Sequence, residues 1–225
     1  MKNLVVISGA GISAESGIQT FRDANGLWEN HDIMEVASFQ GWLKNKELVL
    51  DFYNQRRAQV LSCLPNEAHK GLAALEKSFK VSIVTQNVDD LHERARSTSV
   101  LHLHGELLKS RSTSDSSLIY PCKTPIHLGD LCEEGSQLRP HIVWFGEEVP
   151  LIEDALNIVG QADILLVIGT SLLVYPAAGL IHEAPRTCKK YIIDPHIPDN
   201  IPSDFHPISA TATEGLQKLL NLIHD

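Results

Sequence analysis

The sequence predicts an α/β protein, with a parallel sheet covered by helices on both faces and a smaller inserted lobe. Short apolar runs suited to buried strands alternate with longer segments suited to helices, which is typical of parallel sheets. The first run, residues 4–8, is apolar on both faces, as in strands buried inside such a sheet. Two longer stretches interrupt this alternation, and we expect them to build the lobe.

The pattern predicts five strands and three helices. In chain order, the predicted strands are residues 4–8, 81–85, 100–103, 164–168 and 191–193. The predicted helices are residues 46–61, 67–78 and 214–223. In the last of these, the apolar residues Leu216, Leu219, Leu220 and Ile223 have the spacing of a helix that packs by one face.

Residues 23–44, rich in loop residues, and residues 107–138, polar and serine-rich, fit neither pattern. Loops of this length inside a compact domain usually carry a function or are disordered. We therefore predict one unit over residues 1–225. Its large domain would comprise about 1–25, 66–104 and 145–225, and its small lobe about 26–65 and 105–144.

Bulk composition narrows the class of protein. The chain is 43% hydrophobic and 21% charged, which is ordinary for a globular protein. A formal net charge of −9 argues against general binding to nucleic acid. No apolar run reaches the roughly 18 residues that a membrane span needs, and the start carries no signal-peptide cleavage site. Four scattered cysteines and no export signal predict reduced thiols in a cytoplasm. The acidic composition and the lack of a visible association helix predict a monomer, and we expect no membrane or nucleic-acid partner.

A glycine-containing string, GAGISAESGIQTFRD at residues 9–23, follows the first strand. Gly9 and Gly11 allow a sharp turn and close approach to a ligand, and N–H groups at the helix start would face a pyrophosphate. Dehydrogenases use an earlier third glycine than Gly17 and an acidic residue about 20 positions on, which is missing here. The aromatic and arginine, Phe21 and Arg22, suggest a loop that folds over the cofactor.

Polar side chains also follow the second predicted strand, at the sheet edge where parallel sheets bind ligands. Gln86, Asn87 and Asp89 can hydrogen-bond ribose hydroxyls. The alternative is a polar strand-to-helix turn in which Asp89 or Asp90 caps a helix.

Two histidines end the third strand, and strand alternation places His102 and His104 on the same face. A histidine can take a proton from a hydroxyl near neutral pH, although a strand-end histidine can also serve only as a hydrogen-bonding group. We favour the base for His104, because a glycine follows it at the edge that carries residues 86–89. After the fourth strand, Gly169, Thr170 and Ser171 either contact a nucleotide or form a plain turn.

Together and in this order, the strings GAGISAESGIQTFRD, TQNVDDLHERA, LHGE, LRPHIVWFGE and GTSLLVYPA resemble the sirtuin family of NAD-dependent protein lysine deacylases. The resemblance covers nearly the whole chain. It implies a Rossmann-like large domain and a small lobe, with NAD and an acyl-lysine protein or peptide meeting in the cleft between them.

By this resemblance, the catalytic residues are His104 as general base, with Asn87 and Asp89 orienting the ribose. The implied NAD contacts are Gly9, Ala10, Gly11, Ser13, Phe21, Arg22, Trp28, Gln86, Asn87, Asp89, Gly169, Thr170, Ser171, Asp194 and Ala212. The implied substrate contacts include Val143, Phe145, Gly146 and Leu173, which would bind the peptide as an added strand.

A narrower signal is the pair Tyr53 and Arg56, which lie three positions apart on one helix face. An arginine binds a carboxylate through two hydrogen bonds, and a tyrosine hydroxyl can add a third. In sirtuins such a pair resembles the mark of the subclass that removes succinyl or malonyl groups, and Ala24 would leave space for the longer acyl chain. The alternative is that Tyr53 is core and Arg56 a solvated charge beside Arg57.

The chain departs from the family at the zinc module. Family members usually carry four zinc cysteines, whereas only Cys122 and Cys132 lie in the corresponding interval, with His102 and His127 as substitute ligands to consider. Tetrahedral zinc needs four ligands, so we expect no structural zinc. Asp115, Asp130 and the turn at residues 132–136 would instead hold the lobe by hydrogen bonds.

Three other functions remain open at this stage. The same cleft could transfer ADP-ribose or hydrolyse NAD, or the chain could be a non-catalytic NAD-binding module. The presence of a base, His104, argues against a mere binder. The glycine spacing argues against a hydride-transferring dehydrogenase.

Overall fold

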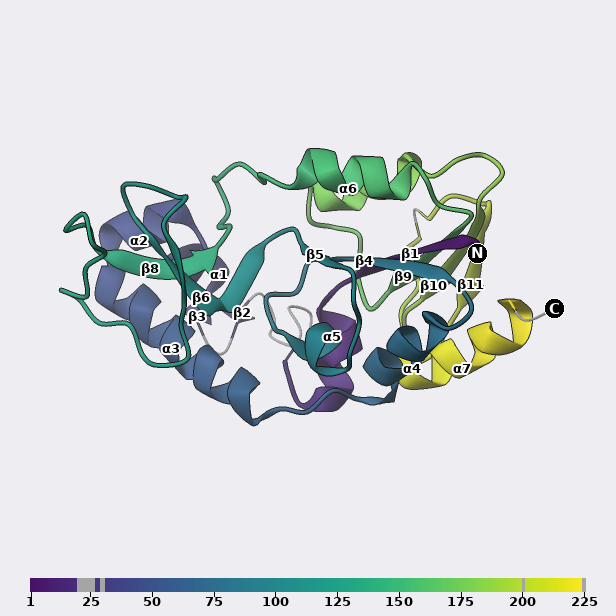
Figure 1. The fold of residues 1–225 in the computed structure, drawn as a ribbon, viewed down its shortest axis with the longest axis horizontal. Coiled ribbons are helices and arrows are strands. Elements are labelled where there is room, and N and C mark those ends of the chain that lie inside the picture. Colours follow the sequence, from purple (N-terminus) through teal and green to yellow (C-terminus); the bar gives the residue numbers. More distant parts are fainter. Residues whose placement is uncertain (20–26, 29–30, 200, 224–225) are drawn as a thin grey trace.

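The computed structural model describes residues 1–19, 27–28, 31–199 and 201–223, except for the side chains of residues 27 and 28. Within these residues the centre of the molecule is a six-stranded parallel sheet with the order β11-β10-β9-β1-β4-β5 (Figure 1). Its strands are β1 (Asn3–Ser8), β4 (Lys80–Thr85), β5 (Val100–His102), β9 (Ile164–Ile168), β10 (Lys189–Ile193) and β11 (Phe205–Ile208). The α/β fold class predicted from the sequence is therefore confirmed.

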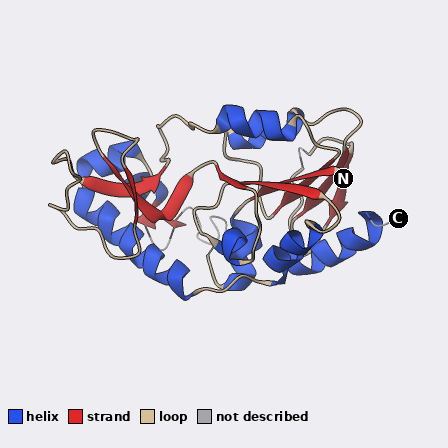
Figure 2. Cartoon of the chain, viewed as in Figure 1, coloured by secondary structure: helices blue, strands red, loops and turns tan. Residues whose placement is uncertain are grey.

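Helices cover both faces of this sheet, as Figures 1 and 2 show. On one face lie α4 (Glu67–Leu75) and α7 (Ala212–Ile223), and on the other lie α6 (Ile152–Val159) and the 3₁₀ helix η2 (Ala177–His182). The strand β1 explains why both faces are covered: Leu4 and Val6 enter one core cluster, whereas Val5 and Ile7 enter the other. Burying apolar side chains on both sides of a strand is the main driving force for such a sheet.

A smaller lobe packs beside the sheet. It contains α1 (Ile33–Val36), α2 (Phe39–Lys44), α3 (Lys46–Ser62) and the antiparallel sheet β7-β6-β8, formed by Ile119–Pro121, Gly105–Ser112 and Leu138–Ile142. The short antiparallel strands β2 (Leu27–Trp28) and β3 (His31–Asp32) pair with each other and directly precede α1 in the chain. The lobe has its own apolar core, in which Trp42, Tyr53 and Trp144 are buried together.

The prediction of irregular structure over residues 23–44 and 107–138 was wrong in part: α1, α2, β7 and most of β6 lie within these ranges, whereas most of residues 113–137 outside β7 form turns and loops. The short helices α1 and α2 begin at side chains that accept main-chain N–H groups: Asp32 accepts from Met34 and Ser38 accepts from Gly41. Such caps stabilise helices that the apolar pattern does not reveal. The serine-rich segment forms β6, where Ser110 and Ser112 are buried in place of apolar residues.

The elements of the large domain that were missing from the prediction include α6 and β11. Helix α6 is only two turns long, and β11 carries Pro207, a residue that usually disfavours a strand. Because β11 lies at the edge of the sheet, only one side of it must supply hydrogen bonds to a neighbour. No helix in the described ranges is both long and apolar enough to cross a membrane.

Candidate active site

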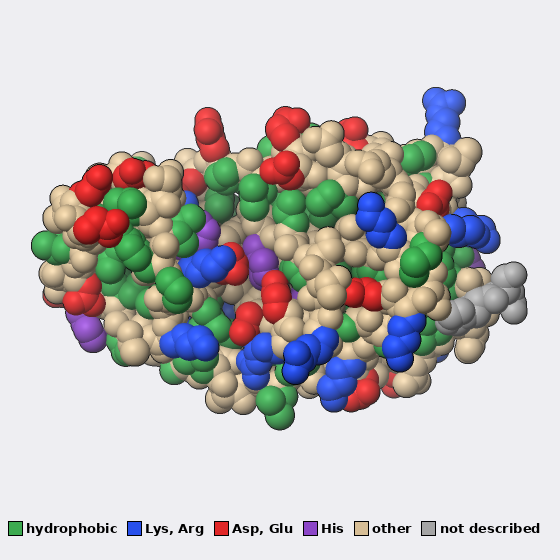
Figure 3. Space-filling model, viewed as in Figure 1, with side chains coloured by type: hydrophobic (Ala, Val, Ile, Leu, Met, Phe, Trp, Pro, Cys, Tyr) green, Lys and Arg blue, Asp and Glu red, His purple; other side chains and the backbone are tan. Residues whose placement is uncertain are grey.

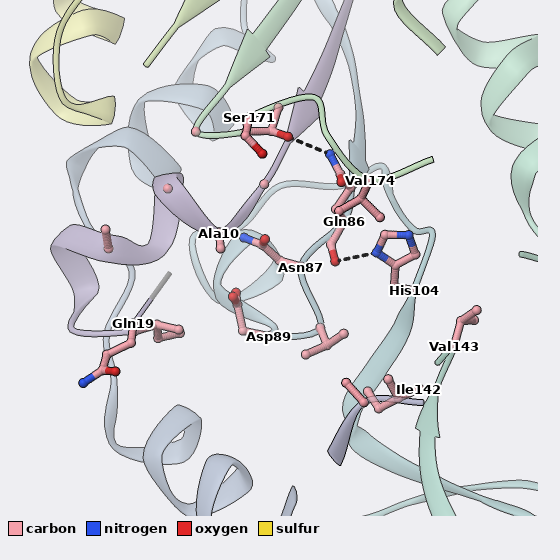
Figure 4. Close-up of a pocket in the computed structure, with 18 of the residues that line it drawn as sticks. Ala10, Gln19, Gln86, Asn87, Asp89, His104, Ile142, Val143, Ser171 and Val174 are labelled. Atoms are coloured by element: carbon pink, nitrogen blue, oxygen red, sulfur yellow. Dashed lines mark hydrogen bonds between the residues drawn. The ribbon is translucent and has the colours of Figure 1, made fainter. Parts of the chain in front are cut away.

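A cavity of about 680 Å³ opens between the sheet and the smaller lobe (Figure 4). Its walls come from the carboxyl ends of β1, β4, β5, β9 and β10, and from α3 and residues 142–147 of the lobe. Ligands of open parallel sheets bind at this edge, and the volume lies in the range of small-molecule sites.

The glycine loop after β1 leads into a 3₁₀ helix, η1 (Ala10–Ser16). A Cβ atom on Gly11 would lie 2.7 Å from the Cα atom of Gly169, so the two loops meet backbone to backbone. The N–H groups of Gly9 and Gly11 donate to the carbonyls of Ile168 and Gly169, at 3.1 and 2.8 Å. These two N–H groups hold the loops together, and both residues line the cavity.

The turn after β4 carries three predicted site residues into the cavity: Gln86, Asn87 and Asp89. The Gln86 amide donates to Thr170 Oγ1 at 3.0 Å, which ties the turn to the loop after β9. Asp89 is buried, and burial raises the pKa of its carboxyl. It accepts from Ser13 Oγ at 3.0 Å and from Leu91 N at 3.1 Å, so it also caps α5 (Leu91–Arg94), as the alternative interpretation proposed.

Ser13 therefore plays a supporting part. It is fully buried behind the cavity wall, donates to Asp89 and accepts from the Asn87 amide at 3.2 Å. It does not line the cavity formed by the described residues, in contrast to the prediction that it contacts the cofactor. Sequence position alone could not separate a residue that touches a ligand from one that holds its neighbours.

His104 lies directly after β5 and lines the cavity opposite Gln86 (Figure 4). Its Nδ1 lies 3.2 Å from the main-chain carbonyl of Gln86. Because a carbonyl only accepts, Nδ1 carries the proton and Nε2 carries the lone pair. Burial lowers the pKa of His104, so the ring is neutral near pH 7 and its Nε2 can act as a base.

The cavity is also lined by Thr170, Ser171, Asp194 and Ala212. Asp194 follows β10 and is buried, and its Oδ1 accepts from His196 N at 2.9 Å. Ala212 is the first residue of α7. The carboxylates of Asp89 and Asp194 give the cavity acceptors for the hydroxyls of two sugars, so its set of acceptors fits a dinucleotide.

On the side of the lobe, Tyr53 and Arg56 project from α3 and line the same cavity. Their exposed fractions are 1% and 5%, so the alternative of a solvated Arg56 is wrong, whereas Tyr53 belongs both to the core and to the cavity wall. The Tyr53 hydroxyl accepts a hydrogen bond of 3.0 Å from Trp144 Nε1.

Trp144 is a site residue that the sequence places only within residues 143–147, the loop expected to bind the substrate peptide, without a part of its own. The guanidinium of Arg139 stacks 3.4 Å from the centre of its ring, and Arg139 in turn forms a 2.6 Å ion pair with Glu147. This stack fixes the indole that orients the Tyr53 hydroxyl. The string WFGE contains two of these residues, but no pattern reveals that they converge on Tyr53.

The remaining predicted substrate contacts divide into two groups. Val143, Phe145 and Gly146 line the cavity, whereas Leu173 is 72% exposed and lies outside the described lining. Phe145 also pairs with α2, because its N–H donates to Ala37 and its carbonyl accepts from Phe39. The predictions for Phe21, Arg22 and Ala24 fall outside the described residues, and for Trp28 only the backbone is described.

The region in which family members usually carry the zinc cysteines is held here by hydrogen bonds. Cys132 Sγ lies 3.4 Å from Ser112 Oγ, which bonds Ser114, and Ser114 donates to Ser136 at 2.7 Å. All four cysteines are buried and unpaired, and no group of three or more His, Cys, Asp or Glu side chains in the described ranges could hold a metal. His102 uses both ring nitrogens for hydrogen bonds to other groups.

Charge is mixed on the face drawn in Figure 3. Lys and Arg side chains lie along the lower part of this face with Asp and Glu side chains among them, so it carries no continuous basic surface.

Comparison with known proteins identifies the architecture. A curated "NAD-dependent protein deacylase" of Helicobacter pylori is 58% identical over 225 residues, covering 98% of this chain and 96% of its own length. One from Bacteroides thetaiotaomicron is 50% identical over 230 residues, covering 99% of this chain and 98% of its own.

Solved structures agree with these relatives. A "Sir2 homolog-NAD complex" is 39% identical with a TM-score of 0.88, covering 99% of this chain and 90% of that chain. A "Sir2 bound to acetylated peptide" is 27% identical with a TM-score of 0.82, covering 98% of this chain and 93% of that chain. The model of the Sir2 family matches residues 9–176, which is more than half of the sequence. The chain therefore belongs to the Sir2 family.

Proposed function

We propose that the protein is an NAD-dependent lysine deacylase that acts on succinyl- and malonyl-lysine as well as acetyl-lysine, giving nicotinamide and O-acyl-ADP-ribose. The observation that carries the proposal is a single cavity lined both by a neutral histidine, His104, and by a buried arginine and tyrosine, Arg56 and Tyr53. The relatives named as NAD-dependent protein deacylases, at 50–58% identity, support the general activity.

When bound, NAD would supply an electrophilic ribose carbon, from which nicotinamide would leave as the acyl oxygen of the substrate attacks. Asp194 and the loop of residues 169–171 would hold the adenosine half, and Asn87 and Asp89 would hold the other ribose. His104 Nε2 would then remove a proton from a ribose hydroxyl, so that this hydroxyl would attack the acyl carbon and lysine would leave with a proton. A water molecule would next attack the same carbon and break its bond to the oxygen on the first ribose carbon, which gives O-acyl-ADP-ribose. Holding both reactants in one enclosed cavity supplies much of the rate by proximity.

The preference for acidic acyl groups rests on the wall formed by α3. A succinyl or malonyl group ends in a carboxylate, which would need a cation and hydrogen-bond donors to leave water. Arg56 supplies the planar donor fork that suits a carboxylate, and Tyr53 supplies a hydroxyl held in place by Trp144. An acetyl group lacks the carboxylate, so it would use the same chemistry without this contact.

Mass spectrometry of NAD incubated with the protein and acetyl-, succinyl- or malonyl-lysine peptides tests the proposal, with the unmodified lysine peptide as control. We expect O-acyl-ADP-ribose with all three, formed fastest with the acidic acyl groups. Free ADP-ribose at the same rate with the control peptide would indicate an NAD hydrolase, and an ADP-ribosylated peptide would indicate a transferase. Unchanged NAD would indicate a binding module.

A further inference from the structure

His102, the last residue of β5, contacts two acceptors at once. The ring is 8% exposed, its Nδ1 lies 2.9 Å from the main-chain carbonyl of Asn87, and its Nε2 lies 2.8 Å from Glu93 Oε1. A carbonyl oxygen cannot donate, and a carboxylate only accepts. Both hydrogen bonds therefore form only when the ring carries a proton on each nitrogen.

Its two histidine neighbours differ in this respect. His104 faces one acceptor through Nδ1, and His92 faces the hydroxyl of Ser8 through Nε2. Burial lowers the pKa of both rings, so they are neutral at pH 7. For His102, burial also disfavours the charge, but the hydrogen bond and the charge of Glu93 outweigh burial and raise the pKa of the ring.

The two histidines at the end of β5 hold consecutive carbonyls of the turn after β4. His104 binds the carbonyl of Gln86, and His102 binds that of Asn87. This turn carries Asn87 and Asp89 into the cavity (Figure 4). Loss of the bond to the Asn87 carbonyl would therefore move the side chains that face the ribose. It would also disturb the neighbouring Gln86 carbonyl, which accepts the hydrogen bond from His104.

We propose that His102 is a positioning residue for NAD: held by Glu93 as a doubly donating ring, it fixes the Asn87 carbonyl and so the turn that carries Asn87 and Asp89. This inference rests on the NAD-dependent activity proposed above.

Loss of one proton from the ring would break the arrangement in a specific way. One N–H would then face two acceptors, and the carboxylate of Glu93 is the stronger of them. The proton would remain on Nε2, facing Glu93. A lone pair of Nδ1 would then face a lone pair of the Asn87 carbonyl oxygen, and the two would repel each other. The bond to Asn87 is thus complete below the raised pKa of His102 and is lost as the pH rises through it.

The other titratable groups that interact with the ring are Glu106 on β6, Asp89 and His92, of which His92 is neutral. Lys109 on β6 interacts with Glu93. Glu106 forms its ion pair with Lys109 at 2.5 Å and makes no direct bond to His102. It therefore provides a matched control, because Glu106→Gln removes a nearby carboxylate of the same kind without touching the ring.

The test compares the KM for NAD against pH in the wild type, Glu93→Gln, Glu106→Gln and His102→Phe. In the wild type and Glu106→Gln, we expect KM to rise about tenfold as the pH passes the pKa of His102, with kcat changing less than KM. In Glu93→Gln the amide can donate to Nε2, which leaves Nδ1–H on the Asn87 carbonyl at every pH, so the alkaline rise disappears. In His102→Phe, KM is high at all pH values.

An NMR titration of the His102 ring in the absence of NAD separates this inference from the proposed function, because it needs no turnover. We expect a pKa above the ordinary value in the wild type and Glu106→Gln, and a lower one in Glu93→Gln. A pKa of the His102 ring at or below the ordinary value in the wild type would overturn the inference. So would a Glu93→Gln variant that keeps the alkaline rise in KM, and this result would leave the deacylase activity itself untouched.

Discussion

Replacing Arg56 by methionine removes the cation from the acyl side of the cavity and keeps an unbranched side chain in its place. The structure distinguishes this arginine from its neighbour. Arg57 donates to the Leu107 carbonyl at 3.1 Å and to Asn54 Oδ1 at 2.8 Å, so it is bound within the lobe. Arg56 lies on the cavity wall with Tyr53.

The magnitude follows from the charge and the burial. Two opposite unit charges about 4 Å apart interact by about 4 kcal/mol at an effective dielectric constant of about 20, and each 1.4 kcal/mol is about tenfold in rate. Removing one partner of a desolvated charge pair costs about 2–5 kcal/mol in practice. We therefore expect kcat/KM for a succinyl-lysine peptide to fall about 10²- to 10³-fold in Arg56→Met. The acetyl-lysine peptide lacks the carboxylate, so its kcat/KM should change less than about threefold.

The assay measures lysine release from succinyl and acetyl versions of one peptide at saturating NAD, so that only the acyl group differs. Tyr53→Phe serves as a milder companion, because it keeps the ring in the core and removes the hydroxyl that Trp144 orients. Thermal unfolding of each variant shows whether the lobe remains folded. Equal losses on both peptides would refute the reasoning, since an acetyl group has no carboxylate and the loss of a carboxylate contact cannot slow its removal.

The remaining predictions concern the base, the metal and the acid stability. His104→Ala should abolish turnover while NAD binding persists by calorimetry; intact turnover would remove the base from the mechanism. Because the pKa of His104 is lowered, the acid limb of kcat/KM in the wild type should lie below pH 6.5, and a limb above that value would contradict the neutral ring. A chelator should leave the unfolding temperature unchanged, and metal analysis should find less than one zinc per chain. One equivalent of zinc would contradict a lobe in which Cys132 is held by its hydrogen bond to Ser112. Burial lowers the pKa of His69 to about 4, so its unfolded form binds a proton first and stability should decline as the pH falls below 6.5, by up to about 3 kcal/mol, measured by urea unfolding. His69→Gln should flatten that decline, and an unchanged slope would assign it to other groups.

The sheet of the large domain was largely predictable because its strands are buried on both faces. Continuous apolar runs located β1, β4 and β9 almost residue by residue. The small lobe was not predictable in the same way. In β6, buried serines stand where apolar residues would produce a signal, and the helices α1 and α2 owe their limits to single capping side chains.

The cavity residues show a similar division. Side chains at strand ends, such as Gln86, Asn87 and His104, were found because a parallel sheet brings its carboxyl ends to one edge. Trp144 acts on Tyr53 across 91 positions of sequence, and no local pattern encodes such a contact. Ser13 lies behind the cavity wall and bonds Asn87, which is 74 positions away in the sequence, so its place could not be predicted from a local pattern either. Local patterns identify which segments meet, whereas long-range packing determines which atoms face the ligand.

The smaller lobe is made of two separate stretches of chain, α1–α3 and β6–β8, and each stretch begins and ends in the large domain (Figure 1). Because the chain joins the lobe to the large domain at several points, the lobe cannot change its position without moving the backbone at these points. One of these points is the step from His104 to Gly105, where a Cβ would lie 2.1 Å from the His141 carbonyl. The packing of the lobe is therefore tied to the backbone directly after the base, so that a substitution which alters this packing would also act on the position of His104.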